Sequence, residues 1–570
     1  MYKNRKTNYP LYEVRECASL RALIDDAARD FPDMVSFRYR SGGEVVSVTY
    51  PEVKEQVDAL GTAMYDLGIG NTHVAIIGAN SFDWVRAYLS TLNTEGVVVP
   101  VDKDLSDDDT VFVLDNSDAT AVFHAGKATE KKLLALEDRL PNIKYFICFD
   151  EPAVKDERHL YVGDLLEKGK ELLAAGDRRF LDVTPDNECL KELLYTSGTT
   201  GRAKGVMLNA KALITNIRAS QMLMKITDTA VSILPYHHSY ESTTGILTMF
   251  HHGMTICINE SLRTVLPNIK FYRPTEVQLV PLFVEKIYRG IWDKAEESGK
   301  AAALRKLIRF SNGMLSVGID LRKPLFKSVT ENFGGRLEKI VCGGAPIRAE
   351  VGKFFEDIGI ILCNGYGITE CSPLVSANPD VGSDCTTVGY PLACLEVKID
   401  EPNADGEGEI LVKGDVVMMG YYHQPEATAA VIRDGWFYTG DYGRIDEKGR
   451  LVITGRKKNI IILGNGKNIY PEELEGYIAG ISYITDCIVY ADRDADGVES
   501  ALCAECAIDP EVLAGTDREE LRARVKSDIF KTLANLPAYK QVARVVVRDK
   551  PFVKTASAKI RRAADGKPLE

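Results

Sequence analysis

A loop rich in glycines and hydroxyl side chains follows an apolar run in the first half of the chain. The run from Leu193 to Thr196 predicts a buried strand, and the loop after it supplies three hydroxyls, three glycines and Lys204. Glycines let several backbone N–H groups point into one concavity, hydroxyls donate to phosphate oxygens, and a lysine neutralises pyrophosphate charge. Lys204 lies between Ala203 and Gly205, so this is not a Walker A loop. The predicted phosphate-binding set is Thr196, Ser197, Gly198, Thr199, Thr200, Gly201 and Lys204.

The order of residues from Tyr195 to Gly205 resembles the signature Y-T-S-G-T-T-G-x-x-K-G of the AMP-forming adenylating superfamily. This superfamily includes acyl-CoA synthetases, aryl-acid ligases, adenylation domains of nonribosomal peptide synthesis and luciferases. Further motifs follow in the family's order over about 365 residues, from Tyr195 to Lys559. The resemblance implies that a carboxylic acid reacts with ATP to form an acyl-adenylate and pyrophosphate, and that the acyl group then passes to CoA. ATP, Mg²⁺ and CoA are the implied cofactors.

Two later motifs carry the residues that the resemblance assigns to adenine. Gly343, Gly344 and Ala345 follow an apolar strand and form a turn whose backbone would lie flat against the base, an approach that glycine permits. In the stretch Asn364-Gly-Tyr-Gly-Ile-Thr-Glu, Tyr366 would stack on the purine and Asn364 would meet its exocyclic amine. An aromatic face suits a planar base, so these residue types fit the implied role.

The same resemblance assigns the metal, the α-phosphate and the ribose. Thr369 would contact the α-phosphate, and Glu370 would bind Mg²⁺, because a hard carboxylate oxygen suits this ion. Thr196, or another hydroxyl of the phosphate loop, would complete the metal shell. Asp441, in Trp436-Phe-Tyr-Thr-Gly-Asp, would accept hydrogen bonds from both ribose hydroxyls, and Arg456 would be the matching cation at the nucleotide.

The stretch from Ser232 to Glu241 resembles the L-P-L-x-H-x-Y-E segment of long-chain acyl-CoA synthetases, with His238 at the histidine of that segment. Relatives that activate amino acids place an Asp near here for the substrate ammonium, whereas no Asp occurs between Val231 and Gly253. The resemblance therefore implies a neutral medium- or long-chain fatty acid. A structural role for His238, bridging loops, is the alternative.

A second lysine stands near the end of the chain. The segment from Phe552 to Arg562 resembles the motif P-K-T-x-x-G-K-I-x-R, with Lys559 at the catalytic position. The resemblance implies that Lys559 stabilises negative charge during adenylation. Val553 replaces the Pro and Ala558 the Gly of this motif, and the methyl group of Ala558 would restrict the loop if that position needs a positive φ.

Three functions are compatible with these motifs. The first is an acyl-CoA ligase. The second is an acyl-AMP ligase that delivers the acyl group to the phosphopantetheine of an acyl carrier protein and shares every motif except the acceptor. The third is a nucleotide- and acyl-binding sensor without turnover, which intact Glu370, Asp441 and Lys559 disfavour because a binder needs no distal lysine.

Alternating strands and helices must position these motifs in the N-terminal part. His73–Gly78 predicts a buried strand, Ser81 caps a helix, and Val97–Val101 predicts the next strand of a βαβ unit. The alternation continues with strands at Ala119–His124 and Tyr145–Phe149 and a helix around Leu133–Leu140. We therefore expect an α/β domain of mixed, largely parallel sheets, with ligands at the carboxyl ends of the strands.

The pattern changes twice in the C-terminal part. Short strands with turn signals from Cys394 predict a small antiparallel subdomain. Beyond Arg456 we expect a helix after Pro471, strands near 483–491 and 500–508, a helix over 518–533 and a strand over 543–547. This pattern predicts a large domain, 1–456, and a small α+β lid domain, 457–570. The resemblance implies that the lid rotates about Lys458, which also belongs to the predicted nucleotide site.

Composition limits the remaining classes. A chain of 570 residues with 45% apolar residues is long enough for several cores. Its formal charge of −12 disfavours nucleic acid as a partner. The sequence shows no signal peptide and no apolar run long enough to span a bilayer, so we expect a cytoplasmic enzyme, with peripheral membrane contact left open. Cys503 and Cys506 form a C-x-x-C in a predicted strand, where packing is favoured over redox or metal roles.

Overall fold

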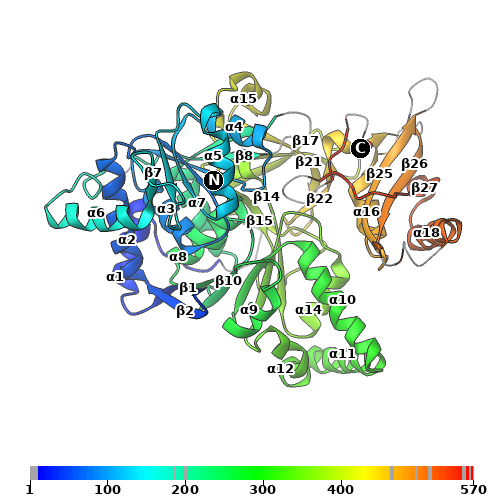
Figure 1. The fold of residues 1–570 in the computed structure, drawn as a ribbon. Helices are drawn as coiled ribbons and strands as arrows, with labels where there is room; N and C mark the ends of the chain where they lie inside the picture. Colours follow the sequence, from blue (N-terminus) through cyan, green and yellow to red (C-terminus); the bar gives the residue numbers. More distant parts are fainter. Residues whose placement is uncertain are drawn as a thin grey trace.

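The computed structural model describes residues 11–184, 186–196, 202–462, 468–493, 499–510, 512, 517–554, 560–563 and 566–568. Two large sheets form the N-terminal part, a smaller antiparallel sheet follows, and the C-terminal segment forms a further α+β unit at the right of Figure 1. The predicted fold class is therefore confirmed.

The predicted βαβ units supply strands of the first large sheet. Its eight strands lie in the order β19-β9-β8-β4-β3-β5-β6-β7. Their bounds are β3 (His73–Ile77), β4 (Val97–Val101), β5 (Ala119–His124), β6 (Tyr145–Cys148), β7 (His159–Tyr161), β8 (Leu190–Thr196), β9 (Lys204–Asn209) and β19 (Gly420–Tyr421). Strands β3 and β4 are buried along almost their whole length, which explains why they read as continuous apolar runs. The predicted phosphate loop follows the carboxyl end of β8 in the sequence, and β9 runs antiparallel to β8.

Helices cover this sheet on both sides. The Ser81 side chain caps α3 by accepting a hydrogen bond from the backbone N–H of Trp84, as the sequence predicts. The helices are α2 (Tyr50–Asp66), α3 (Phe82–Leu92), α4 (Asp107–Asn116), α5 (Lys127–Leu136) and α6 (Val162–Ala174). Trp84, Tyr88 and Phe123 are among the largest fully buried side chains of the core beneath them.

The second large sheet has nine strands in the order β16-β15-β14-β13-β12-β10-β11-β1-β2. Their bounds are β1 (Val35–Ser41), β2 (Glu44–Thr49), β10 (Thr229–Ser232), β11 (Thr255–Ile258), β12 (Glu276–Leu279), β13 (Lys339–Cys342), β14 (Ile361–Gly367), β15 (Leu374–Ala377) and β16 (Tyr390–Pro391). Strands β11, β10, β12, β13 and β14 run parallel. The motifs predicted for adenine thus lie at the carboxyl ends of β13 and β14, where open parallel sheets bind ligands.

The helices of this half are mostly crossovers between its strands. They are α1 (Leu20–Asp30), α7 (Ala210–Gln221), the π-helix η2 (Tyr240–Thr248), α8 (Met249–His251), α9 (Val265–Tyr272), α10 (Pro281–Glu297), α11 (Ala301–Ser316), α12 (Arg322–Leu325), α13 (Lys327–Thr330) and α14 (Ala349–Asp357), with short 3-10 turns η3 (Glu331–Phe333) and η4 (Thr369–Cys371). A further 3-10 turn, η1 (Glu137–Arg139), belongs to the first sheet and follows α5. The π-helix η2 begins with Tyr240 and Glu241, the last two residues of the predicted acyl stretch, Ser232–Glu241, and so places that stretch beside the sheet.

An antiparallel sheet follows, as the change of pattern at Cys394 predicts. It contains β17 (Leu395–Asp400), β18 (Gly408–Gly414), β20 (Ile432–Arg433), β21 (Trp436–Ile445) and β22 (Leu451–Arg456), with α15 (Pro425–Val431) before β20. Strands β21 and β22 pair antiparallel with Asp441 opposite Arg456. The two residues predicted for ribose and nucleotide are therefore neighbours by register.

The C-terminal segment agrees closely with the predicted elements. After the 3-10 turn η5 (Lys457–Asn459) it contains β23 (Ile461–Ile462), β24 (Asn468–Ile469), α16 (Pro471–Ile478), β25 (Ile484–Arg493), β26 (Glu499–Ile508), α18 (Arg518–Leu533), the 3-10 turn η6 (Ala538–Lys540) and β27 (Arg544–Val547). Its apolar residues form a cluster of their own that includes Leu474, Val489, Leu502 and Val525.

The cysteines and the longest helices remain to be described. All twelve cysteines are free thiols, and Cys503 and Cys506 are buried in β26, where both belong to apolar clusters. Among the described residues, no helix has both the length and the apolar character needed to cross a bilayer.

Candidate functional site

A cleft of about 2920 Å³ brings together the described residues that the sequence assigned to the nucleotide, metal and acid. Its lining includes Thr196, Lys204, His238, Gly343, Gly344, Ala345, Asn364, Tyr366, Thr369, Glu370, Asp441, Arg456 and Lys458. The predicted residues 197–201 and Lys559 lie outside the described residues. The cleft is bordered by the ends of β8, β13, β14 and β21 and by the C-terminal segment, so residues far apart in sequence share one space.

The predicted metal ligand and the phosphate-loop lysine are linked through Tyr421. The hydroxyl of Tyr421 donates to Glu370 Oε1 at 2.9 Å, and Lys204 Nζ lies 4.7 Å from the centre of the Tyr421 ring. The Glu370 carbonyl also accepts from the backbone N–H of Met418 at 2.9 Å. Burial, together with the neighbouring Glu370 carboxylate, raises the pKa of Tyr421 well above its ordinary value. Tyr421 therefore remains a proton donor that orients Glu370 while its ring supports a cation.

Arg456 and Tyr366 both contact Asp441 in the cleft. Arg456 Nε lies 2.8 Å from Asp441 Oδ1, and the hydroxyl of Tyr366 donates to Asp441 Oδ2. Asp441 is only 3% exposed. Burial and the adjacent carboxylate raise the pKa of Tyr366 well above its ordinary value. A carboxylate has about four acceptor positions, so one carboxylate can accept from a tyrosine hydroxyl and an arginine and also from ligand hydroxyls.

The motifs predicted to bind adenine contain a buried acceptor that has no partner among the described residues. Asn364 donates through Nδ2 to the carbonyl of Thr387 at 3.3 Å, while its Oδ1 is buried and accepts from no described residue. Beside it, Gly344 has φ +88°, a left-handed conformation that favours glycine. At Gly343, a Cβ atom would lie 3.4 Å from the ring of Tyr240. The site thus combines a left-handed glycine turn with an acceptor suited to an exocyclic amine.

The acyl stretch contacts Thr369, the residue predicted to bind the α-phosphate. Ser239 Oγ lies 3.5 Å from Thr369 Oγ1, which joins the segment after β10 to η4 across 130 residues of sequence. His238 precedes Ser239 and lines the same cleft. Its ring centre is 4.4 Å from that of His237, whose Nε2 lies 3.7 Å from Asp102 Oδ2. Burial lowers the pKa of His237 to about 4, so this imidazole is neutral at physiological pH.

Tyr240 and Glu241 support the wall of the cleft. The hydroxyl of Tyr240 donates to the carbonyl of Val341 at 3.1 Å. Glu241 accepts from the hydroxyl of Ser232 at 2.5 Å, and its carboxyl group is buried. Burial raises the pKa of Glu241 to about 8, although the Ser232 hydrogen bond opposes the shift. Near pH 7 the buried Glu241 carboxyl is therefore held mainly in its protonated, uncharged form.

The C-terminal segment contributes cations to the same cleft. Lys458 lines it, and burial together with Arg456 and Arg562 lowers the pKa of Lys458. Arg562 forms an ion pair with the buried Glu475, and it donates to the carbonyl of Val489 at 2.9 Å. Lys554 and Ile560, which flank the undescribed residues around Lys559, form an antiparallel bridge. The two ends of the predicted catalytic loop are thus held together beside the cleft.

The donor set around Glu370 fits a magnesium ion. Among the described residues, no group of three or more His, Cys, Asp or Glu side chains could hold a metal without other ligands. Mg²⁺ is usually held by one or two carboxylates plus substrate phosphates and water. Glu370 supplies one oriented carboxylate, and Thr196 ends β8 in the same cleft.

Several residues of the site were not predicted from the sequence. Tyr421, Ser239, and the pair His237 and Asp102 carry no motif of their own. The signal available for Ser239 and His237 was their place inside the acyl stretch. Tyr421 stands in Met419-Gly-Tyr-Tyr, where a tyrosine after glycine gives no indication that it supports a carboxylate 51 residues away.

Comparison with known proteins gives one family and a consistent set of relatives. The profile of the AMP-binding enzyme family matches residues 24–422. The chain is 28% identical to the long-chain-fatty-acid–CoA ligase FadD15 of Mycobacterium bovis over 524 residues, which cover 88% of this chain and 84% of that protein. It is 29% identical to the peroxisomal long chain acyl-CoA synthetase 6 of Arabidopsis thaliana, covering 95% of this chain and 80% of the relative.

Solved structures share the fold. The adenylation domain of a carboxylate reductase from Mycobacterium chelonae superposes with a TM-score of 0.78 at 22% identity, covering 97% of this chain and 89% of that domain. The o-succinylbenzoate CoA synthetase of Bacillus subtilis, solved with ATP and a magnesium ion, has a TM-score of 0.70 at 21% identity over 94% of this chain and 97% of the other.

Proposed function

The chain belongs to the AMP-binding enzyme family, and we propose that within this family it activates a medium- or long-chain fatty acid as acyl-AMP and transfers the acyl group to CoA. Curated relatives that are long-chain-fatty-acid–CoA ligases support this choice of acid and acceptor. So does the acyl stretch, whose buried groups carry no counter-charge for a substrate ammonium.

The contact between Ser239 and Thr369 is the observation that carries the proposal. It brings the acyl stretch within 3.5 Å of the residue assigned to the α-phosphate. A carboxylate entering along Ser239 would therefore arrive beside the phosphorus that it attacks. Holding two reactants in this way turns a bimolecular step into one within a complex, which is a large part of what such an enzyme supplies.

The residues around Glu370 serve the first step. Glu370 and a loop hydroxyl, Thr196 in our assignment, would hold a Mg²⁺ ion, which supplies positive charge to the phosphate oxygens when bound. Lys204, on the face of Tyr421, and Thr369 would contact the phosphates directly. Lys559 is proposed as the mobile cation that completes this set during adenylation.

The residues around Asp441 would hold the nucleoside. Asp441, positioned by Arg456 and Tyr366, would accept hydrogen bonds from the ribose hydroxyls. The unpaired Oδ1 of Asn364 would accept from the adenine amine, and Gly343 to Ala345 would lie along the base. The ring of Tyr366 would stack on the purine. These contacts persist through both steps and keep the adenylate from leaving.

The second step requires a movement of the C-terminal segment. We propose domains 1–456 and 457–570, with the hinge at Lys458 in η5. The segment has its own apolar cluster and reaches the rest of the chain through polar contacts, such as Tyr470 donating to Glu407 at 2.8 Å and Arg289 donating to the carbonyl of Ala479 at 2.5 Å. Polar contacts of this kind can be exchanged for others at small cost, as a lid needs.

The direct test separates this activity from the two alternatives. We expect pyrophosphate release when ATP, Mg²⁺ and a fatty acid are added, followed by acyl-CoA formation when CoA is supplied. A sensor would bind both ligands and release no pyrophosphate. A carrier-protein ligase would release pyrophosphate and then transfer the acyl group to a holo carrier protein but not to free CoA. Either outcome would contradict the proposal.

A further inference from the structure

A lobe of crossover helices beside β12 has a surface unlike the rest of the chain. Helix α9 leads into β12, and α10 to α13 lead from β12 to β13. Apolar residues of α9, α10, η3 and α14 share one cluster, which includes Ile269, Val284, Phe333 and Phe355, so these elements form one packed unit. Figure 1 shows α9, α12 and α11 along the lower edge of the molecule.

The charge of this lobe is opposite to that of the whole chain. Residues 300–327 contain seven basic side chains and one acidic side chain, Asp320, for a net charge of +6, whereas the full chain carries −12. Among the described carboxylates, none lies within 4.0 Å of the charged group of Lys306 or Arg309. These two cations therefore project a positive field into solvent.

Helix α11 presents apolar residues on the same face as these cations. Its inner side is packed, with Ala301 and Ser311 buried. Lys306, Phe310 and Val317 recur at helical spacing on the outer side. Phe310 is 55% exposed, Val317 is 70% exposed, and Ile319 just beyond the helix is 46% exposed.

This exposure is concentrated rather than scattered. Of the 18 exposed large apolar side chains among the described residues, four lie between Phe310 and Ile319. Single exposed apolar residues are ordinary on protein surfaces, but clusters bordered by charge mark interaction sites.

Helix α9 repeats the pattern at the edge of the cleft. Leu262, Leu266 and Phe271 are exposed around it, and exposed Arg263 and Lys270 accompany them. Leu262 is 67% exposed and also lines the cleft. The mixture of apolar and basic residues thus extends to the mouth of the proposed acid-binding site.

We propose that this lobe docks on the surface of an anionic lipid bilayer. The α9–α11 surface is defined by its apolar members Leu262, Leu266, Phe271, Phe310, Val317 and Ile319 and its basic members Arg263, Lys270, Lys306 and Arg309. Apolar side chains with flanking Lys and Arg are the pattern by which helices lie in the headgroup region, and the basic groups are complementary to anionic lipids. Docking goes beyond the proposed reaction and does not depend on it.

The proposal is tested by sedimenting the full chain with phosphatidylserine–phosphatidylcholine vesicles and with pure phosphatidylcholine vesicles. We expect binding to the anionic vesicles, little binding to the neutral ones, and release by salt. Each cation at an anionic surface contributes about fivefold in partitioning, so Lys306→Ala with Arg309→Ala should reduce binding about 25-fold. Phe310→Ser with Val317→Ser should also weaken binding, and the binding that remains should be fully salt-dependent because all the cations are kept.

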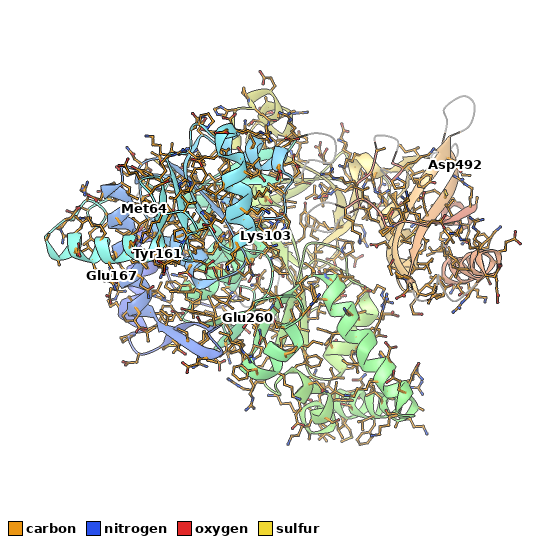
Figure 2. The ribbon with its side chains drawn as sticks, viewed as in Figure 1. Met64, Lys103, Tyr161, Glu167, Glu260 and Asp492 are labelled. Atoms are coloured by element: carbon orange, nitrogen blue, oxygen red, sulfur yellow. The ribbon has the colours of Figure 1, made fainter. Side chains whose placement is uncertain are left out.

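Matched variants elsewhere control for charge and exposure. Lys131→Ala with Lys168→Ala removes two exposed cations from α5 and α6, and α6, with its labelled Glu167, lies at the far side of the molecule from α11 (Figures 1 and 2). Val381→Ser changes a 65% exposed valine outside the lobe. Both controls should bind vesicles like the wild type, and all variants should keep the wild-type melting temperature.

Three results would overturn the proposal. The first is equal binding to anionic and neutral vesicles, or to neither. The second is an equal loss of binding in the lobe variants and the controls. The third is a concentration-dependent dimer that Phe310→Ser with Val317→Ser abolishes while vesicle binding stays unchanged, which would assign the surface to a second copy of the chain.

Discussion

Tyr421 provides a sharp test of how Glu370 is held. The substitution Tyr421→Phe removes the hydroxyl that donates to Glu370 Oε1 at 2.9 Å and keeps the ring 4.7 Å from Lys204 Nζ. If Glu370 binds the magnesium ion, its loss of orientation should appear as weaker metal binding and not as a general loss of activity. Because the pKa of Tyr421 lies well above its ordinary value, the effect should be the same across neutral and mildly alkaline pH.

The size of the effect follows from the contact. A hydrogen bond to a charged acceptor is worth about 1.5–3 kcal/mol, and loss of a residue that orients a metal ligand typically costs about 10–100-fold in affinity or activity. We therefore expect the Mg²⁺ concentration for half-maximal activity to rise about 10–100-fold in Tyr421→Phe. Tyr421→Leu also removes the cation–π contact with Lys204, which is worth about 0.5–1 kcal/mol and should add about two- to fivefold.

The assay is ATP–pyrophosphate exchange with a saturating fatty acid, titrated with Mg²⁺. Tyr422→Phe is the matched control, because the Tyr422 hydroxyl donates to Asp118 at 2.7 Å and touches no proposed metal ligand. It should leave the Mg²⁺ dependence unchanged. The reasoning is refuted if Tyr421→Phe has the Mg²⁺ dependence of the wild type, or if it loses rate equally at every Mg²⁺ concentration.

Three further outcomes are expected. Lys458→Pro fixes a backbone dihedral at the proposed hinge, so adenylation should survive and CoA transfer should fail, whereas equal loss of both steps would argue against a hinge there. Lys559→Ala should slow acyl-AMP formation by about 10²–10³-fold and leave transfer from pre-made acyl-AMP near the wild-type rate, and a mutant that adenylates normally would exclude the role. Glu241 has a pKa raised to about 8, so the folded protein holds a proton that the unfolded chain releases near its ordinary pKa of 4.5, and stability from this group falls as pH rises between these values. The melting temperature of Glu241→Gln should therefore rise relative to that of the wild type as pH increases from about 4.5 to about 8. If the difference between the two melting temperatures does not change with pH, the Glu241 carboxyl is charged in the folded protein and the reasoning is wrong.

Much of the fold could be predicted because its signals are local. Strands buried on both faces, such as β3 and β4, read as short apolar runs, and the cap at Ser81 marks a helix start. Strand β8 likewise reads as an apolar run before the predicted phosphate loop. The C-terminal elements were predicted to within a few residues because each has its own period and turn signals.

The site was predictable only as far as it consists of motifs. Glu370 and Asp441 stand in recognisable strings, whereas the partners that orient them are supplied by topology. Tyr421 reaches Glu370 because β19 pairs with β9 at the edge of the first sheet, and no local pattern encodes that pairing. In the same way Glu475 meets Arg562 across 87 residues, although only the arginine belongs to a motif.

The choice of acid is the central claim, and ATP–pyrophosphate exchange with a panel of acids tests it most directly. The panel should contain fatty acids of increasing length, aryl acids and the common amino acids, each with ATP and Mg²⁺ and without CoA. The account predicts strong exchange with medium- or long-chain fatty acids and none with amino acids, because the acyl stretch carries no Asp between Val231 and Gly253. Robust exchange with any amino acid, together with none for the fatty acids, would contradict it.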